Sequence, residues 1–373
     1  MDFMKLTIDR ATLLRALEPT RRVAEAKSTI PILSHALLSA QAGGLVLRAT
    51  DLDIESRVTV EARVETCGDL AVSAATLHDL VRKLPEKAEV SLFLEGDQLH
   101  MRSGRSRFKL STLSAQDWPD IPDLDYPAEF ELPAKTLARL LAKTSFAIST
   151  EETRYYLNGV FFHHTTNDDG PALRMVATDG HRLARMETAA PSGAAPMPGV
   201  IVPSKACAEV ERLLKSAEGD IGVAVSRTKI RFAIGATVLS SKLIDGTFPD
   251  YARVIPANNP TRAEVDRAEL AAAADRVSTI SSERGRAVKL SFGDDRLALC
   301  VVNPDHGEAS DEVEASYQAP PMEIGFNSRY LAEVLAALDG DRAIIRLADA
   351  GSPTIFQSAT QNDLLVVLMP MRV

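Results

Sequence analysis

The sequence predicts an α+β fold in which three similar domains follow one another, each made of two strand–helix–sheet units. Two observations lead to this prediction. A short pattern recurs six times, in which a strand-like apolar residue is followed five positions later by an apolar residue that opens a helical stripe. The segments between the recurrences alternate polar and apolar residues, which is typical of antiparallel sheets with one covered face.

The pattern forms two interleaved series along the chain. The first lies at 6–13, 130–137 and 263–270, and the second at 71–77, 201–207 and 325–331. The strand positions 8, 72, 132, 202, 265 and 326 are separated by 64, 60, 70, 63 and 61 residues. Six units of this length predict domains at 1–127, 128–259 and 260–373, with Pro-rich linkers near 123–127 and 256–260. A coincidental recurrence remains the alternative, because a five-residue offset between strand and helix is common.

Each unit is expected to open with a strand that leads directly into a helix of about three turns. Asp9, Ser73, Asp266 and Asn327 are expected N-caps, because their side-chain oxygens can accept from the free N–H groups of a first helical turn. Two prolines, at 133 and 203, suit early helical positions. The strands that follow each helix are predicted from alternating apolar residues, such as Leu45, Leu47 and Ala49, or Val288, Leu290 and Phe292.

The composition is that of a globular chain without a membrane segment. Of 373 residues, 45% are hydrophobic and 25% charged, and aromatic residues are only 5%, so the cores must be built from Leu, Val, Ile and Ala. No apolar run approaches the roughly 20 residues that span a bilayer. The alternating N-terminus Met1–Leu6 carries no signal peptide, which predicts a cytoplasmic protein with no membrane partner. Cys67, Cys207 and Cys300 lie far apart and are expected to be free thiols.

The charges are distributed unevenly between helices and the rest of the chain. The net charge is −9, yet the six helical windows together carry +7, which leaves −16 for sheets and loops. The windows 10–27 and 133–145 each carry +3. A basic helical surface on an acidic body can attract a phosphate backbone while discouraging binding elsewhere. Ordinary solvated helix faces are the alternative for any single helix.

Helix spacing decides how many chains could surround a duplex. Helices pack about 8–10 Å apart, so six would enclose a circle about 17 Å in diameter, which a DNA duplex already fills. Twelve helices from two chains would enclose about 34 Å. If helices line a ring, with antiparallel sheets outside, one chain is too few and two suffice.

Catalytic motifs are missing from the sequence. Asp179 and His181 could form an acid–base pair, but there is no nucleophile elbow, P-loop, H-E-x-x-H helix or dinucleotide fingerprint. The His and Cys residues form no ligand cluster. We therefore expect no catalytic residue, no metal and no cofactor. A repeat scaffold that binds only proteins is a further alternative, which the basic helical windows disfavour.

Several segments resemble the bacterial sliding clamp, the beta subunit of DNA polymerase III. They are Arg154–Gly159, Ala177–Ala184, Phe248–Tyr251 and Met369–Val373, with Ser103–Phe108 and Met322–Asn327 in support. The resemblance runs the full length, in order. It implies a head-to-tail homodimer closed into a ring on duplex DNA, three similar domains per chain, and no catalysis. It also implies that a separate ATP-driven loader opens the ring, since this chain lacks a nucleotide-binding motif.

The resemblance further implies a pocket between the second and third domains, completed by a C-terminal partner-binding tail. It receives short linear motifs of the DNA polymerase III alpha subunit, the clamp loader, other polymerases and repair proteins. Aliphatic walls and adaptable Met side chains suit that role. Matching positions are Leu157, Thr178, Gly180, His181, Arg182, Leu183, Pro249, Arg253, Val254, Val367, Leu368, Met369, Pro370, Met371 and Arg372, with Asn327 and Tyr330 at the edge. From the residues alone, 364–373 would be an ordinary edge or core strand with a frayed end.

Other positions are carried over from the resemblance for DNA contact and ring closure. Those matching DNA-facing residues are Lys27, Arg82, Tyr155, Tyr156 and Lys205, with core packing as the alternative for the two tyrosines. Ring closure would set Phe108 and Leu110 against the partner's helix carrying Thr279 and Ile280, with domain-one core as the alternative for the first two. The departures are Glu151, Ser204 and Val373, where relatives often carry Gln, Arg and Leu, and three residues before Met4, the expected start.

Overall fold

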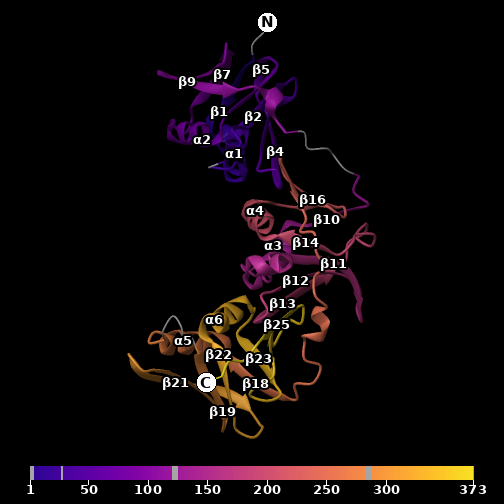
Figure 1. The fold of residues 1–373 in the computed structure, drawn as a ribbon, viewed down its shortest axis with the longest axis vertical. Helices are drawn as coiled ribbons and strands as arrows, with labels where there is room; N and C mark the ends of the chain where they lie inside the picture. Colours follow the sequence, from indigo (N-terminus) through magenta and orange to yellow (C-terminus); the bar gives the residue numbers. More distant parts are fainter. Residues whose placement is uncertain (1–3, 27, 120–124, 282–286, 373) are drawn as a thin grey trace. The chain divides into compact units, whose positions relative to one another are not determined.

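The computed structural model describes residues 4–26, 28–119, 125–281 and 287–372 (Figure 1). They form two compact units. Unit 1 comprises Met1–Leu137, Pro191–Pro198 and Lys205–Leu243. Unit 2 comprises Ala138–Ala190, Gly199–Ser204 and Ile244–Val373. The middle third of the chain therefore contributes to both units.

Unit 1 is built on an antiparallel sheet of 13 strands in the order β10-β15-β16-β17-β4-β3-β2-β6-β9-β8-β7-β1-β5. Its strands are β1 Lys5–Asp9, β2 His35–Gln41, β3 Gly44–Thr50, β4 Ile54–Val60, β5 Arg63–Thr66, β6 Gly68–Ser73, β7 Glu89–Glu95, β8 Gln98–Ser103, β9 Ser106–Leu113, β10 Ala128–Pro133, β15 Asp220–Val225, β16 Lys229–Ile234 and β17 Thr237–Lys242.

Unit 2 holds a second antiparallel sheet, of 12 strands in the order β14-β11-β12-β13-β25-β24-β23-β18-β21-β20-β19-β22. Its strands are β11 Gly159–Asn167, β12 Gly170–Thr178, β13 Arg182–Ala189, β14 Val200–Pro203, β18 Thr261–Asp266, β19 Ala287–Gly293, β20 Arg296–Asn303, β21 Gly307–Tyr317, β22 Met322–Asn327, β23 Arg342–Leu347, β24 Thr354–Ser358 and β25 Leu364–Leu368.

The α-helices follow strands as the repeat predicts. They are α1 Arg10–Val23, α2 Ala74–Lys83, α3 Ala134–Ala142, α4 Ser204–Leu214, α5 Arg267–Ser278 and α6 Ser328–Ala337. Short 3-10 helices are η1 Pro31–Ser34, η2 Ala115–Asp117, η3 Ser145–Ala147, η4 Glu152–Leu157 and η5 Tyr251–Arg253. The four predicted N-caps are confirmed, since each side chain accepts from a first-turn N–H. The two prolines, in contrast, end β10 and β14 one residue before their helices.

One strand pairing is made once in each unit, in the same register. In unit 1, β4 pairs with β17 from Ile54 opposite Ser241 to Val58 opposite Thr237. In unit 2, β13 pairs with β25 from Arg182 opposite Leu368 to Met186 opposite Leu364. We call these the β4–β17 junction and the β13–β25 junction. Each unit is therefore two sheets of the repeat joined edge to edge into one.

The core consists mainly of Leu, Val, Ile and Ala, as the low aromatic content predicts. Aromatic side chains fill a few central places, such as Phe326, which meets Phe356 edge to face at 5.9 Å between ring centres. The three cysteines are free, but only Cys207 is buried. Among the described residues, no helix is both long and apolar enough to cross a membrane.

Candidate functional site

The turn between β12 and β13 is fixed by its own side chains. The Thr178 hydroxyl donates to the Arg182 carbonyl at 2.7 Å, and one Asp179 carboxylate oxygen accepts the N–H groups of His181 and Arg182 at 2.9 and 3.0 Å. Gly180 has φ +87°, and a Cβ there would lie 2.6 Å from the Arg154 guanidinium. This φ favours glycine, and the turn leaves the His181 side chain exposed.

The C-terminal segment runs beside this turn. The Met369 N–H donates to the His181 carbonyl at 2.8 Å, and the Met371 N–H donates to the Gly325 carbonyl at 2.7 Å. Residues 364–368 form a buried strand between β13 and β24, so this part of the terminal run is core. Met369 is half-buried, and Met371 is 37% exposed. The last described residues are therefore held at the surface with their adaptable side chains accessible.

An apolar cluster lies beneath the turn and the terminal segment. Its buried members are Leu157, Val176, Leu183, Ile201, Phe248, Tyr251, Ile355, Leu365 and Val367. The Tyr251 hydroxyl is 3.0 Å from His163 Nε2 and accepts from Arg174 at 3.0 Å. Burial lowers the pKa of His163, which favours its neutral form. At the rim, Pro249, Arg253 and Val254 are exposed.

Arg182 is an internal ion-pair centre and not a free wall of the pocket. Its side chain is 6% exposed and pairs with Asp179 at 3.2 Å and with Glu333. Its guanidinium also lies 4.3 Å from the centre of the Tyr330 ring. Burial alone would raise the pKa of Glu333, but its bonds from Arg182 and Arg329 lower it, so the carboxylate stays ionised. His181, Arg182 and Tyr330 line a cavity of about 410 Å³ together with Phe146 and Glu151.

All predicted pocket positions lie in unit 2, and Leu157, Leu183 and Val367 belong to one apolar cluster at the β13–β25 junction. Leu157, Leu183, Val367 and Leu368 form its buried floor. Asn327 caps α6 through the N–H groups of Arg329 and Tyr330. The other predicted positions are found in the turn, in η5 and the residues beside it, in the first turn of α6 and in the C-terminal segment, namely Thr178, Gly180, His181, Arg182, Pro249, Arg253, Val254, Tyr330, Met369, Pro370, Met371 and Arg372.

The predicted DNA-facing positions are distributed over both units. Lys27 lies outside the described residues. Arg82 lies in the last turn of α2 with 62% of its side chain exposed, 3.7 Å from Asp79, and the exposed Lys205 lies in the first turn of α4 and pairs with Asp51. Tyr155 is 54% exposed, as a contact residue should be. Tyr156 is half-buried against the apolar cluster, which fits the core-packing alternative better.

Three positions differ from the residues expected in relatives, namely Glu151, Ser204 and Val373, and the structure describes the first two. Glu151 binds the Arg154 side chain at 2.6 Å, and this bond lowers the pKa of the carboxyl group. Ser204 is exposed at the start of α4. Val373 lies outside the described residues.

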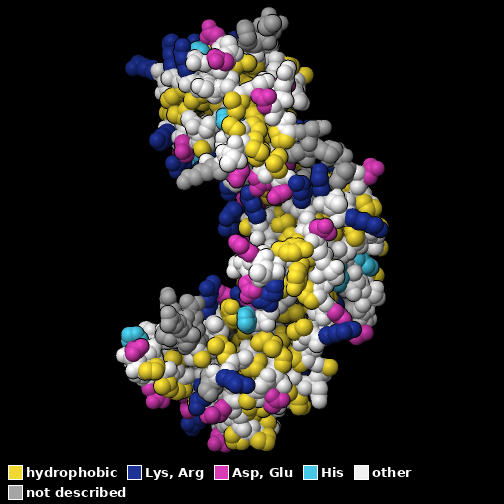
Figure 2. Space-filling view, viewed as in Figure 1, with side chains coloured by type: hydrophobic (Ala, Val, Ile, Leu, Met, Phe, Trp, Pro, Cys, Tyr) yellow, Lys and Arg dark blue, Asp and Glu magenta, His cyan; other side chains and the backbone are white. Residues whose placement is uncertain are grey.

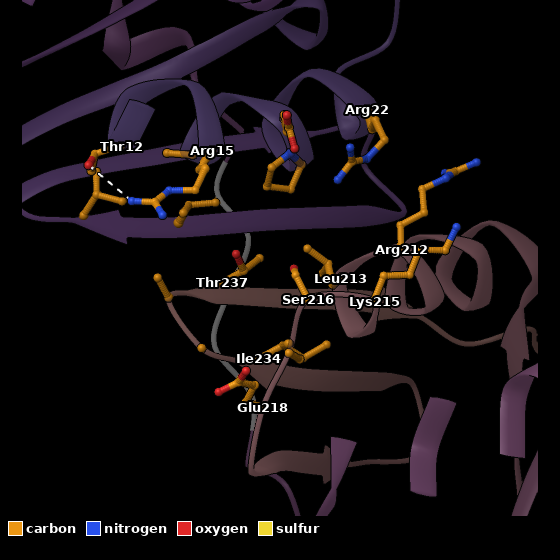
Figure 3. A pocket seen from close by; sticks show the side chains of 18 residues that line it. Thr12, Arg15, Arg22, Arg212, Leu213, Lys215, Ser216, Glu218, Ile234 and Thr237 are labelled. Atoms are coloured by element: carbon orange, nitrogen blue, oxygen red, sulfur yellow. Dashed lines mark hydrogen bonds between the residues drawn. The ribbon is translucent and has the colours of Figure 1, made fainter. Parts of the chain in front are cut away.

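The helical surface of unit 1 is basic where α1 and α4 flank one cavity. Arg15 and Arg22 from α1 and Arg212 and Lys215 from α4 and its end surround a cavity of about 610 Å³ (Figure 3). The carboxylate of Glu209, 4% exposed, accepts from Arg22 at 2.8 Å and lies 3.3 Å from Arg212. Figure 2 shows Lys and Arg side chains over α4 and β16, with acidic side chains beside them. The predicted basic helices are thus present, with some of their charge neutralised.

Ion pairs that the sequence did not predict join α3 and the residue after it to two acids, one just after α6 and one just before β25. Arg139 binds Asp363, and it binds Asp339 at 2.8 Å, while Lys143 binds Asp339 at 2.6 Å. The bond to Asp363 is the main cause that raises the pKa of Arg139. Two of the three cations of the window 133–145 are therefore already paired. The acids lie about 200 residues further along the chain, so no local pattern could have identified them.

The positions predicted for ring closure lie on the surface of their respective units. Phe108 and Leu110 are half-buried on β9, where they alternate with exposed Arg107 and Lys109. Thr279, at the end of α5, is exposed. Ile280 is half-buried, and its carbonyl accepts from Asn303 at 2.6 Å. In the described part of the chain, no group of three His, Cys, Asp or Glu residues could hold a metal ion.

Three family models cover almost the whole chain. They describe the N-terminal, central and C-terminal domains of the DNA polymerase III beta subunit and match residues 4–122, 131–250 and 252–372. The chain is 48% identical to the beta sliding clamp of Caulobacter vibrioides over 373 residues, which is 99% of this chain and 100% of the relative. It is 38% identical to that of Escherichia coli over 372 residues, again 99% of this chain and 100% of the relative.

Solved structures agree with the sequence relatives. A sliding clamp from Bartonella birtlesii, bound to griselimycin, superposes with a TM-score of 0.97 at 46% identity and covers 100% of both chains. The Caulobacter crescentus beta sliding clamp gives the same TM-score at 47% identity, also over 100% of both chains. The repeated α+β units are thus those of a processivity subunit with three similar domains. The chain belongs to the DNA polymerase III beta subunit family, the beta sliding clamps.

Replacing Asp339 with Asn should lower the free energy of unfolding at pH 7 by about 1–2 kcal/mol, because Arg139 and Lys143 lose a charged acceptor. Burial would raise the pKa of Asp339, but its two cationic partners lower it in the folded chain. Its stabilisation is therefore complete above the ordinary Asp pKa of about 4 and is lost as pH falls through the lowered folded value. Urea unfolding at pH 7, 5 and 3 should show the difference between wild type and variant shrinking only in the most acidic sample.

The exposed Asp69 provides the matched control. Asp69→Asn should change the unfolding free energy by less than about 0.5 kcal/mol at every pH. An Asp339→Asn deficit that remains constant down to pH 3 would contradict the ion-pair account.

Proposed function

We propose that this chain is a DNA sliding clamp, a non-catalytic processivity subunit that encircles duplex DNA as a head-to-tail homodimer and tethers the replicative polymerase. Its domains span 1–127, 128–259 and 260–373. The observation that carries the proposal is the junction made twice within the chain, because two strand edges that would complete a third junction remain open.

The open edges belong to β9 and β21. In sheet order, β9 corresponds to β17 and β25, and β21 corresponds to β4 and β13. Among the described residues, β9 pairs with β8 from Ser106 to Ser111 and with β6 only at Thr112 and Leu113. β21 pairs with β20, and with β18 only from Ala315 to Tyr317. Unpaired edges favour association, and a head-to-tail contact that repeats an internal junction closes when the rotation allows.

The two edges are complementary in charge. β9 carries Arg107 and Lys109, while β21 carries Glu308, Asp311, Glu312 and Glu314. In the register of the two internal junctions, Lys109 would face Glu308 of a second copy. Phe108 and Leu110 supply apolar contact area beside these charges, and Thr279 and Ile280 lie at the end of α5, which packs on β21. Opposite charges across strands stabilise such a pairing and suppress other registers.

DNA contact would come from the helices of the ring's inner wall. Arg82, Lys205 and Tyr155 have exposed side chains suited to phosphate contact, and Lys27 and Tyr156 are proposed on resemblance alone. Contacts to phosphate carry no sequence information and weaken with salt, which suits a ring that must slide. Retention on DNA would then depend on encirclement and not on affinity.

Partners would bind at the β13–β25 junction. The buried floor accepts an aliphatic or aromatic side chain, while Met369, Met371, Pro249 and Val254 form an adjustable rim. Short linear motifs of the polymerase III alpha subunit, the clamp loader, other polymerases and repair proteins would share this pocket in turn. In the Caulobacter crescentus relative, PEG is bound to a region described for beta-motif tethering. Neither binding nor sliding calls for a cofactor, and ring opening is assigned to an ATP-driven loader.

Encirclement predicts that retention depends on DNA topology. Clamp loaded onto nicked circular DNA should remain bound after free protein is removed, and it should be lost within minutes once the circle is cut. Gel filtration of labelled clamp with the DNA, before and after linearisation, measures this. Circular DNA without loader is the control. Equal retention on circular and linear DNA would disprove encirclement.

Deleting Met369–Val373 should abolish stimulation of the polymerase and leave the dimer intact. The deletion removes the N–H bonds of Met369 and Met371 and their part of the rim, but it leaves β9, β21 and α5 unchanged. Primer extension on a long template and the mass in solution are the two measurements. A truncated chain that becomes monomeric, or one that still stimulates fully, would show that the pocket is misassigned.

A further inference from the structure

The β4–β17 junction of unit 1 repeats the turn that borders the proposed partner pocket of unit 2. The Thr50 hydroxyl donates to the Ile54 carbonyl at 2.9 Å, as Thr178 does to Arg182. One Asp51 oxygen accepts the N–H groups of Asp53 and Ile54 at 2.9 and 2.8 Å, as Asp179 does for His181 and Arg182. The two turns therefore have the same hydrogen-bonded framework.

In both units, the end of the strand that pairs across the junction is hydrogen-bonded to the turn in the same way. The Lys242 N–H donates to the Asp53 carbonyl at 2.7 Å, and the Met369 N–H donates to the His181 carbonyl at 2.8 Å. Lys242 thus occupies in unit 1 the place that Met369 occupies in unit 2. After Lys242 the chain continues to Leu243, whose N–H donates to the Thr228 carbonyl at 2.9 Å.

A cavity of about 260 Å³ opens at this junction. Thr50, Leu52, Asp53, Ser240 and Lys242 line it, at the places of Thr178, Gly180, His181, Val367 and Met369. A small apolar cluster in the same unit comprises Ile32, Leu33 and Ala71, with Leu113 and Trp118 packed against it. Two of its members have counterparts at the same positions of the repeat in the larger cluster of unit 2: Leu33 corresponds to Leu157, and Ala71 corresponds to Ile201.

Leu52 is the residue that distinguishes this turn. It has φ +79°, the left-handed region that disfavours a branched side chain, at the place where unit 2 has Gly180. The side chain is 41% exposed at the cavity. A strained, exposed leucine where glycine would relieve the strain indicates that the side chain itself is used.

We propose that this cavity is a second docking site for a short extended peptide, which presents an aliphatic side chain to Leu52 and carboxylates to Lys242. The proposal rests on the peptide-binding role proposed for the pocket of unit 2. Lys229 and Lys242 line the cavity together with Asp53 and Glu55, and Glu55 is already paired with Arg48 at 2.6 Å. At the place of Lys242, unit 2 has the apolar Met369, which follows β25. Lys242 pairs with Asp53 at 3.1 Å with both side chains more than half exposed, so an incoming carboxylate can replace Asp53 at little cost.

Photo-crosslinking tests the proposal on the full-length protein. The probe is a synthetic nine-residue peptide with one Leu between Asp residues and a benzoylphenylalanine at its end, and mass spectrometry maps the labelled segments. The expected result is labelling of 50–55 and 240–242 as well as of 178–183 and 367–372. A matched peptide with Lys in place of Asp should label the unit 1 segments at least fivefold less.

Variants separate the two sites. Leu52→Glu should remove the unit 1 labels alone, deletion of Met369–Val373 should remove the unit 2 labels alone, and Val302→Glu, on another exposed apolar residue, should change neither. Leu52→Gly should fold with an equal or higher melting temperature, because glycine suits this φ, and should also lose the unit 1 labels. Undiminished unit 1 labelling of that variant would overturn the role of Leu52.

The outcomes distinguish this inference from the proposed function. Labels in unit 2 alone would overturn the second site and leave the function unaffected. Labels in neither unit would overturn peptide docking at both junctions.

Discussion

Edge-to-edge strand pairing is the interaction on which the rest of this structure depends. Each repeat ends in a strand whose backbone N–H and C=O groups need partners, and the chain provides them twice, at β4–β17 and at β13–β25. The pairing extends two sheets into one and places a turn, a following strand and an apolar cluster at the same point. The site in unit 2 follows directly, because its turn, floor and terminal segment all belong to one junction. The edges of β9 and β21 are open for the same reason. β9 belongs to the first domain and β21 to the last, so neither strand has a neighbouring domain of the same chain to pair with.

Electrostatics modifies the repeat without changing its backbone. At the β13–β25 junction, Arg139 and Lys143 are neutralised by Asp339 and Asp363. In unit 1, α1 and α4 instead bring Arg15, Arg22, Arg212 and Lys215 around one cavity, with Glu209 satisfying two of them. The two junctions are therefore alike in hydrogen bonding and different in charge, which is how one architecture can offer different surfaces to different partners.

Much of the fold could be predicted because the sequence repeats its local signals. Asp9, Ser73, Asp266 and Asn327 recur at the same place before α1, α2, α5 and α6, and the alternating segments between them became antiparallel strands. The resemblance identified the residues of the site, but it did not show what each side chain contacts. No local sequence pattern indicates that Arg182 is buried and paired with Glu333, since the two residues are 151 positions apart. The equivalence of Leu52 and Gly180 has a signal in the sequence, because Ala-Thr-Asp precedes both residues, but only the matching hydrogen bonds show that the two turns have the same framework.

The central claim is that two copies close the ring by making the missing junction twice. Disulfide formation in a Lys109→Cys, Glu308→Cys double variant tests it most directly, with each single variant as a control for the exposed Cys67. Oxidation should convert the double variant almost completely to covalent dimers on a non-reducing gel, because each dimer contains two such contacts. A ladder of longer species would show contacts that do not close, and chains that remain monomeric would show that β9 and β21 do not meet.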